Sequence, residues 1–316
     1  MQTVTRKGIY VNMSKSLVFG SFVVDLMSRS QHLPVPGETV RGSMFKMGPG
    51  GKGFNQCVAA HKAGADVTMV TKIGRDPLAD VVLDAMDELG MDKSHLIYHE
   101  TKETGAALIL VNENSGQNMI VVIPGTCDTI TAEEVKKITP LIKESEYILL
   151  QLEVNQDANE LVMDIAVGHG CKVIVNTAPY SPLSDDFLSK AYMVTPNETE
   201  AEALTGIRVT DAACASRAAA FFKEKGVKNV IITMGDKGAF VSSGGREDVV
   251  PAFSVKTLDT TGAGDAFNGG LLTALSEGKD IWEAVKFGNA LAAISVQRLG
   301  TTPSMPTRQE ILELID

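Results

Sequence analysis

One stretch in the last third of the chain predicts a loop that turns directly into a helix. It reads Leu258-Asp259-Thr260-Thr261-Gly262-Ala263-Gly264-Asp265-Ala266-Phe267-Asn268-Gly269-Gly270. Its glycines allow the backbone to approach a bound group, and the N-terminus of a helix offers unpaired N–H donors and a positive dipole end that suit a phosphate. Asp265 is then either a simple N-cap or the base that takes a proton from the group attacking that phosphate.

The composition fits one large α/β domain, or a core with an appendage. The chain has 316 residues, of which 44% are hydrophobic, and a net charge of −10. That charge argues against nucleic acid or an anionic membrane as the main partner. No apolar run approaches the length of a membrane span, and residues 1–12 lack the apolar core of a signal peptide. The four cysteines form no CxxC pair, so we expect reduced thiols in a cytoplasmic protein.

Strands alternate with helices along most of the chain, which predicts a mainly parallel sheet covered by helices on both faces. Several predicted strands end in an acid or amide: residues 17–25 deliver Asp25, residues 147–152 lead to Glu153, and residues 192–195 run into Asn197 and Glu200. Such sheets bind ligands at the carboxyl ends of their strands. We therefore expect these side chains along one edge, together with Asp265.

A second glycine-rich string, Gly48-Pro49-Gly50-Gly51-Lys52-Gly53, matches the GxGxxG pattern of dinucleotide-binding folds. We reject that interpretation, because the preceding residues are not a convincing first strand of a βαβ unit. The string is not a Walker A loop either, since Gly53 stands where Ser or Thr should follow the lysine. What remains is a turn that brings backbone close to a small ligand. Asn55 enters the next helix and offers a donor and an acceptor suited to sugar hydroxyls.

Residues 105–112 and 117–123 predict a β-hairpin with a polar turn between them. Both strands are apolar at successive positions, so both faces of this small sheet must be covered. One face could close over a ligand and the other could pack on a second subunit. Residues 33–47 suit short exposed strands and turns.

These motifs make the chain similar to the ribokinases and, more widely, to the PfkB carbohydrate kinases. The similarity extends from Lys15 onward and rests on residues 50–56, 197–200 and 259–265. It implies a three-layer α/β/α core with a mainly parallel sheet and a small β-sheet lid. The implied core comprises residues 15–32, 50–102 and 127–316. The implied lid and dimer clasp comprise residues 33–49 and 103–126. Residues 1–14 form an N-terminal extension without assigned function.

The resemblance implies transfer of a phosphoryl group from ATP to the C5 hydroxyl of a pentose, with Asp265 as general base. Gly262, Ala263 and Gly264 would form the anion hole. The sugar would lie among Val23, Asp25, Gly50, Gly51, Lys52, Asn55, Glu153 and Asp265. The nucleotide would lie among Asn197, Thr233, Met234, Gly235, Asp236, Lys237, Gly238, Gly264 and Asn289.

The resemblance also implies two cations and a homodimer. Asn197 and Glu200 would organise Mg²⁺, mostly through water. A K⁺ site would use Asp259, Thr261, Ser295, Arg298, Gly300 and Ser304, several of them through backbone carbonyls. The lid would join two subunits.

Val23 departs from the ribokinase pattern, which typically has Asn two residues before the sugar-binding Asp. Valine cannot pair with a hydroxyl, and an unpaired buried hydroxyl costs roughly 1–3 kcal/mol. We expect D-ribose as substrate if another side chain or a water compensates. The alternative is 2-deoxy-D-ribose, because the deoxyribokinase branch is similar in having an apolar residue here. Another PfkB sugar or nucleoside kinase, a non-catalytic sugar-binding protein and a nicotinamide-dependent oxidoreductase are further alternatives.

Overall fold

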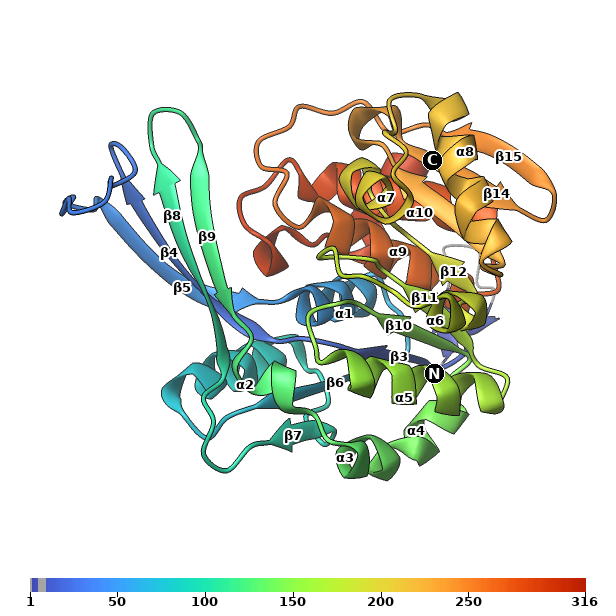
Figure 1. The fold of residues 1–316 in the computed structure, drawn as a ribbon, viewed down its shortest axis with the longest axis horizontal. Helices are drawn as coiled ribbons and strands as arrows, with labels where there is room; N and C mark the ends of the chain where they lie inside the picture. The colour runs from blue at the N-terminus through green and yellow to red at the C-terminus, as the bar shows by residue number, and fades with distance from the viewer. Residues whose placement is uncertain (1, 5–9) are drawn as a thin grey trace.

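The computed structural model describes residues 2–4 and 10–316, with side chains from residue 13 onward. A three-layer α/β/α core forms the main body, and a small sheet projects from one side of it (Figure 1). Of the expected N-terminal extension, residues 1 and 5–9 lie outside the described residues. The short strands β1 (Gln2–Val4) and β2 (Tyr10–Asn12) pair with each other.

The central sheet confirms the prediction of a mainly parallel sheet. Its strand order is β15-β14-β13-β12-β11-β10-β3-β6-β7, and all neighbours from β13 to β7 are parallel. Only β14 and β15 are antiparallel to their neighbours. The strands are β3 (Ser16–Phe19), β6 (Val67–Ile73), β7 (Leu96–Tyr98), β10 (Tyr147–Leu150), β11 (Lys172–Val175), β12 (Met193–Val194), β13 (Asn229–Thr233), β14 (Ala239–Ser243) and β15 (Arg246–Val250).

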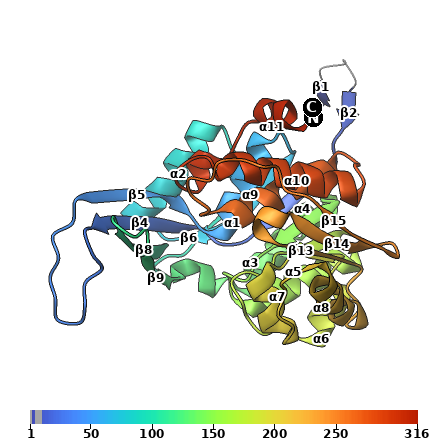
Figure 2. The ribbon, with the colours of Figure 1, turned by 90° about the horizontal axis from the view of Figure 1, so that it is seen from above.

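Helices cover both faces of this sheet (Figure 2). One face carries α1 (Lys52–Lys62), α2 (Pro77–Leu89), α9 (Ala263–Ser276), α10 (Ile281–Ser295) and α11 (Arg308–Ile315). The other carries α3 (Ala132–Lys137), α4 (Thr139–Glu144), α5 (Gln156–Gly168), α6 (Asp185–Lys190), α7 (Glu198–Thr205) and α8 (Ala212–Glu224). Strand residues alternate between two hydrophobic cores, so Val18 packs into the α1 side while Leu17 and Phe19 pack into the α5 side.

Local sequence signals set most helix ends. Asp76 accepts two N–H bonds at the start of α2, and Gly90 ends that helix with a φ of 66°. A capping box of Thr131 and Glu134 begins α3. The helical stretch from Ala132 to Glu144 is divided into α3 and α4. Pro140 lies at the start of α4, where it provides no N–H for a continuous helix.

The small sheet has the order β5-β4-β8-β9, built from β4 (Val23–Ser30), β5 (Met44–Gly50), β8 (Gly105–Asn112) and β9 (Asn118–Ile123). The predicted hairpin is therefore confirmed as β8 and β9. β4 pairs with β8 in parallel and with β5 in antiparallel orientation. Because β5 belongs to this sheet and not to a βαβ unit, rejecting a dinucleotide-binding fold was correct.

The single strand predicted over residues 17–25 is wrong. The core strand ends at Phe19, and a new strand of the small sheet begins at Val23. Asp25 therefore lies within the small sheet and not at the carboxyl end of a core strand, and residues 23–30 join the sheet that we expected only from residues 33–49 and 103–126. The sequence hides this break because Phe22, Val23 and Val24 are buried like the core strand before them.

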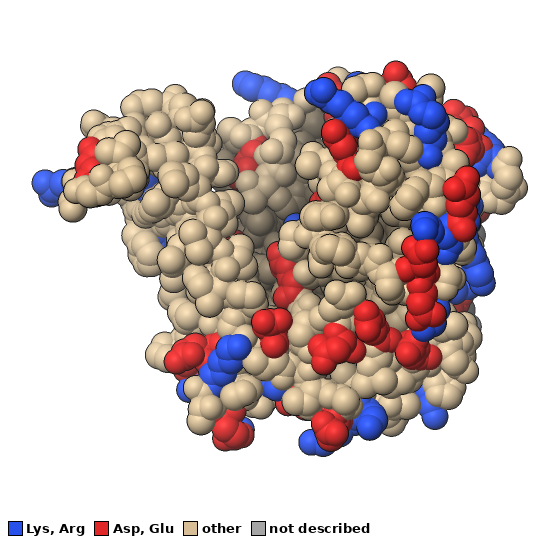
Figure 3. Space-filling model, viewed as in Figure 1, with Lys and Arg blue, Asp and Glu red and all other residues tan. Residues whose placement is uncertain are grey.

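Large hydrophobic side chains are exposed along the small sheet, and all six residues of β9 are exposed. Much of this projection is without charged groups in Figure 3. We call this surface the lid patch: Met44, Phe45, Met47, Leu108, Met119, Ile120, Val121, Val122 and Ile123. Among the residues that the structure describes, no helix is both long enough and apolar enough to cross a membrane.

Candidate active site

Asp265 lies in the first turn of α9. Gly262 is the N-cap, with a φ of 76° that glycine adopts without a side-chain clash, and Ala263 and Gly264 are the first two helical residues. The interpretation of Asp265 as an N-cap is therefore wrong. No side chain in the described part of the chain caps the first N–H groups of α9. Those groups and the positive end of the helix dipole suit a phosphate.

Two consecutive amides of α1 hold the Asp265 carboxylate. Asn55 Nδ2 donates to Asp265 Oδ2 at 3.1 Å, and Gln56 Nε2 donates to Asp265 Oδ1 at 2.9 Å. Burial raises the pKa of Asp265, Lys52 and the two amides oppose that rise, and Glu153 adds to it. A carboxyl group with a raised pKa, held beside an open helix N-terminus, is arranged to take a proton from a hydroxyl.

Asp25 lies beside the glycines that end β5. A Cβ on Gly50 would lie 2.4 Å from Asp25 Oδ1, so only glycine leaves room for the carboxylate. Gly51 follows as the N-cap of α1, with a φ of 90°. Burial first, and then the carboxylates of Glu153 and Asp265, raise the pKa of Asp25 to about 6. Acids from three separate segments thus lie within electrostatic reach of one another.

Glu153 joins two points where the chain crosses between the sheets. Its Oε2 accepts from Ser21 Oγ at 2.6 Å and from the Lys52 backbone N at 2.8 Å. Ser21 lies in the break between β3 and β4, and Lys52 is the first residue of α1 after β5. The side chain predicted to hold sugar therefore also fastens the base of the small sheet.

Lys52 provides the positive charge among these acids. Burial lowers its pKa, but Asp265, Glu153 and Glu200 act together to raise the pKa of Lys52 above its ordinary value. The surface is hollowed between the small sheet and the core, and acidic atoms are visible inside that groove (Figure 3). Two of the predicted sugar residues, Glu153 and Asp265, therefore lie within electrostatic reach of the Lys52 ammonium group.

Val23 lies on the same face of β4 as Asp25, because alternate strand residues share a face. It is 4% exposed. A Cβ on Gly105 of the neighbouring strand would lie 2.8 Å from Val23 Cγ1. The apolar side chain is therefore fixed beside the predicted sugar-binding acid.

Asn197 and Glu200 form a reciprocal capping box at the start of α7. Glu200 N donates to Asn197 Oδ1 at 2.8 Å, and Asn197 N donates to Glu200 Oε2 at 2.9 Å. Burial raises the pKa of Glu200, while the Asn197 N–H and Lys52 lower it. Each oxygen already has a protein donor and keeps further acceptor capacity, which fits a metal bound through water better than one bound directly.

The predicted nucleotide residues lie mostly after β13. Thr233 ends that strand and bridges to Asn197, which places the two side by side. Asn289 of α10 donates to the carbonyls of Val250 and Pro251, at 3.0 and 3.1 Å. Gly264 lies in the first turn of α9. The other residues form the turn into β14: Met234, the 3₁₀ helix η2 of Gly235, Asp236 and Lys237, and Gly238.

The residues predicted for K⁺ come from two segments, Asp259–Thr261 and Ser295–Ser304. The carboxylate of Asp259 accepts a hydrogen bond from each segment. Thr261 N donates to Asp259 Oδ1 at 2.9 Å, and Gly300 N donates to Asp259 Oδ2 at 3.0 Å. Burial raises the pKa of Asp259, but these donors and the charge of Arg29 together lower it below its ordinary value. The other side chains have partners within the protein: Ser295 donates to Ala292 O, Ser304 donates to Thr301 O, and Arg298 pairs with Glu310.

Some backbone carbonyls of these segments already accept within the chain: Ser295 O accepts from Arg298 N at 3.0 Å, and Thr301 O accepts from Ser304 N at 3.0 Å. Throughout residues 13–316, no group of three or more His, Cys, Asp or Glu side chains is placed to hold a metal. That absence concerns sites built from carboxylate, thiolate or imidazole side chains. It does not concern a site built from backbone carbonyls, which is the kind that the resemblance implies.

Sequence reasoning missed a set of buried polar residues behind Asp265. Thr302 Oγ1 donates to Asn55 Oδ1 at 3.0 Å, which directs the Asn55 amino group toward Asp265. The others are Gln56, Gln151, Asn176, Thr195 and Asn268. The available signal was a polar residue beside an apolar run, as at Gln151 directly after Tyr147–Leu150.

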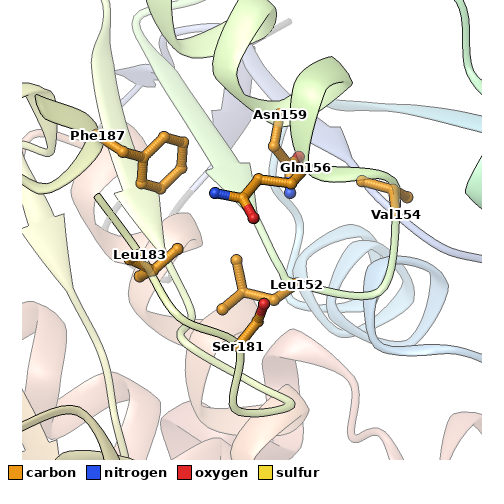
Figure 4. A pocket seen from close by; sticks show the side chains of 7 residues that line it. All are labelled: Leu152, Val154, Gln156, Asn159, Ser181, Leu183 and Phe187. Carbon is orange, nitrogen blue, oxygen red and sulfur yellow. The ribbon is translucent and has the colours of Figure 1, made fainter.

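A small pocket is lined by none of the predicted site residues, although Leu152 and Val154 flank Glu153 in the sequence (Figure 4). It is lined by Leu152, Val154, Gln156, Asn159, Ser181, Leu183 and Phe187, and its volume is about 20 Å³. The Oδ1 atom of Asn159 is buried without a protein partner. A polar space of this size accommodates about one water molecule, so it is too small for a sugar or a nucleotide.

The chain matches the model of the pfkB family of carbohydrate kinases over residues 13–308. It is 42% identical to a ribokinase of Haemophilus influenzae, over 96% of this chain and 99% of that protein. It is 36% identical to a deoxyribokinase of Salmonella typhi, over 94% and 97%.

Solved structures agree with these relatives. A ribokinase from Thermotoga maritima matches with a TM-score of 0.87 and 36% identity, over 96% of this chain and 99% of that one. An Arabidopsis thaliana ribokinase complexed with ribose and ATP matches with a TM-score of 0.89 and 27% identity, over the same shares. The expected three-layer fold with a small separate sheet is confirmed.

Proposed function

The chain belongs to the pfkB family of carbohydrate kinases, which transfer a phosphoryl group to a sugar hydroxyl, and we propose that it phosphorylates the C5 hydroxyl of D-ribose with ATP. One observation carries this proposal: the Asp265 carboxylate is held by two amides beside the open N-terminus of α9. The 42% identical Haemophilus ribokinase supports ribose, and the Arabidopsis complex with ribose and ATP supports the substrate pair.

The proposed chemistry follows from that arrangement. The sugar hydroxyl oxygen attacks the γ-phosphorus, its proton passes to Asp265, and the bond from phosphorus to the ADP oxygen breaks. The N–H groups of Gly262, Ala263 and Gly264 would stabilise the charge on the transferring group, with Ala263 N exchanging its present partner, Thr260 O at 3.1 Å, for the phosphate. Asp25, Asn55 and the backbone at Gly50 and Gly51 orient the sugar, with Lys52 and Glu153 beside them.

The two cations are proposed on the donor sets described above. Asn197 and Glu200 would hold Mg²⁺ mostly through water, and the ion would neutralise phosphate charge. Carbonyls of the Asp259–Thr261 and Ser295–Ser304 segments would hold K⁺, with Asp259 ionised. Thr233 to Gly238 and Asn289 would line the nucleotide site.

The small sheet is proposed as the lid over the groove and as the surface that joins two subunits. Closure over the sugar would exclude water, which is otherwise a competing phosphoryl acceptor. The lid patch supports the dimer, because exposed apolar surface of this extent favours contact with another protein surface. A second copy of the chain provides the same patch for a symmetric contact.

2-Deoxyribose is the second candidate substrate, and Val23 favours it. The side chain is buried on the Asp25 face of β4 and cannot hydrogen-bond a sugar hydroxyl. The similarity to a deoxyribokinase at 36% identity supports the same alternative.

The deciding experiment measures ADP release with ribose, 2-deoxyribose, fructose and nucleosides as acceptors. We expect turnover with ribose. Turnover only with 2-deoxyribose would replace ribose in this proposal, and absence of turnover with every acceptor would contradict sugar phosphorylation.

A further inference from the structure

The amide of Gln56 has a partner for each of its hydrogen atoms. Nε2 donates to Asp265 Oδ1 and to Asn176 Oδ1, both at 2.9 Å, and Oε1 accepts from Gln151 Nε2 at 2.7 Å. Gln56 and Gln151 are 0% exposed, so bulk water cannot replace these hydrogen-bond partners. Since a planar amide has its donors at one end and its acceptor at the other, the three partners define which end faces Asp265.

The two acceptors Asp265 and Asn176 set this orientation, and Gln151 supports it from behind. If the Gln56 amide turned over, its oxygen would face the oxygens of Asp265 and Asn176, and its amino group would face that of Gln151. The contacts to Asp265 and Asn176 would then oppose like atoms inside the protein, where unpaired polar groups are strongly unfavourable. The contact to Gln151 would be restored only if that amide turned as well, since Gln151 Oε1 is buried without a partner. Among the described residues, no hydrogen bond joins Gln151 to Asp265, so the hydrogen-bonded route from Gln151 to the carboxylate passes through Gln56.

The same network reaches the backbone of the first turn of α9. Asn176 Nδ2 donates to Thr195 O at 3.0 Å, Thr195 Oγ1 donates to Asn268 Oδ1 at 2.6 Å, and Asn268 Nδ2 donates to Gly264 O at 2.8 Å. The Gly264 carbonyl belongs to the peptide group that also contains the Asp265 N–H. Side chains that follow β10, β11 and β12 therefore hold both the carboxylate and a peptide of the helix N-terminus.

We propose that Gln56 is a positioning residue that fixes the plane of the Asp265 carboxylate for proton transfer, and that Gln151 fixes Gln56. The proposal rests on the proposed function, in which Asp265 is the base. With Asn55 on Oδ2 and Gln56 on Oδ1, rotation of the carboxylate breaks a hydrogen bond. The remaining acceptor positions of both oxygens then face the attacking hydroxyl in a constant geometry.

The charged groups that act on Asp265 come from four other places in the fold. They are Lys52 on α1, Glu153 after β10, Asp25 on β4 and Glu200 on α7. Gln56 is uncharged, so replacing it leaves these four charges in place. A changed titration of Asp265 in a Gln56 variant therefore reports the lost amide.

The test uses Gln56→Met, which keeps the length of the side chain and removes the donor. We expect kcat to fall about 10- to 100-fold, as for a small misplacement of a reacting group, with KM for the sugar within about threefold. The acid limb of the pH–rate profile moves to higher pH, because the Gln56 donor lowers the pKa of Asp265. Gln151→Met gives a smaller loss in the same direction, and the double variant matches Gln56→Met alone.

Thr273→Val is the matched control. Thr273 is 0% exposed on α9 and donates to Gly269 O at 2.8 Å, without contact to Asp265. We expect a lower melting temperature with unchanged kcat and pH profile. The proposal is overturned if Gln56→Met behaves like this control, or if the effects of Gln56→Met and Gln151→Met on kcat simply multiply.

A titration of the Asp265 carboxyl carbon by ¹³C NMR, assigned with Asp265→Asn, separates this proposal from the proposed function. If no sugar is phosphorylated by the wild-type protein, the proposed function fails, and the NMR titration still tests Gln56. A higher titration midpoint in Gln56→Met supports the positioning role, and an unchanged midpoint overturns it. If Gln56→Met does not fold, the same two outcomes are judged on Gln151→Met.

Discussion

Gly50 lies directly against the carboxylate of Asp25, where a Cβ would approach Oδ1 to 2.4 Å. Gly50→Ala must therefore displace either Asp25 or the end of β5. We expect KM for the sugar to rise about 10-fold or more, because a hydrogen bond to a charged group contributes about 1.5–3 kcal/mol. KM for ATP should change little. Initial-rate kinetics with each substrate varied in turn measure both values.

Gly48→Ala is the matched control for that experiment. Gly48 lies on the same strand, and a Cβ there would meet no atom within 4 Å. We expect near wild-type kinetics for this variant. Equal effects of the two substitutions would show that β5 tolerates no side chain in general, and would remove the specific link between Gly50 and Asp25.

Asp265→Asn should reduce kcat by about 10²- to 10⁴-fold, the usual contribution of a positioned general base. The amide cannot accept the hydroxyl proton, whereas Asp25, Asn55 and Glu153 remain to hold the sugar. Isothermal titration calorimetry should therefore show sugar binding within a few fold of wild type. Near-normal turnover would exclude Asp265 as the base, and loss of sugar binding would reassign it to substrate binding.

Stability should depend on pH through Asp25. Its pKa rises from 3.8 to about 6 on folding, so the folded protein holds this proton more tightly than the unfolded chain. The stabilisation is complete below about pH 4 and is lost as the pH rises through 6. Asp25→Asn removes this loss. Because the pKa of Asp25 rises from 3.8 to about 6, we expect the free energy of unfolding of the variant, compared with that of wild type, to be higher at pH 8 than at pH 4 by on the order of 2–3 kcal/mol.

Urea unfolding of both proteins at pH 4, 6 and 8 measures that difference. Comparing variant with wild type at each pH cancels the titration of groups that the substitution leaves unchanged. A stability difference that is the same at all three pH values would show that Asp25 titrates normally in the folded protein.

The sequence predicted the layers of the fold because strand and helix periodicities are local properties of the chain. It also predicted that Asp25, Glu153, Glu200 and Asp265 would gather, since strand ends of one sheet share an edge. The break between Phe19 and Val23 was not predictable, because buried strands of two different sheets have the same apolar composition. Asp25 consequently reached the predicted site from a different sheet.

The amides behind the base were not predictable for a different reason. Gln151 meets Gln56 across 95 residues of sequence, and Thr302 meets Asn55 across 247. Each residue alone is an ordinary polar side chain with no periodic or motif signal for its partner. Only the packing of α1 between α9 and the strand ends brings these residues together.

The lid patch should join two subunits. Val121 is 60% exposed on β9. Val121→Glu would place a charge within the proposed dimer contact, where an unpaired buried charge is strongly unfavourable. We expect light scattering to show a wild-type dimer and a variant shifted to monomer. Val167→Glu on α5, also an exposed valine, should remain dimeric. A monomeric wild type, or a dimeric Val121→Glu variant, would contradict the proposed contact.

Val23 should decide between ribose and 2-deoxyribose. Val23→Asn adds a donor and an acceptor on the Asp25 face of β4, and a hydrogen bond to the extra hydroxyl of ribose contributes about 0.5–1.5 kcal/mol. We expect the ratio of kcat/KM for ribose to that for 2-deoxyribose to rise about 3- to 10-fold. Val23→Ala removes the two methyl groups without adding a polar group, and should leave the ratio near wild type. Competition between the two sugars in one reaction measures the ratio directly. If both variants shift it equally, the space at position 23 controls selectivity and hydrogen bonding does not.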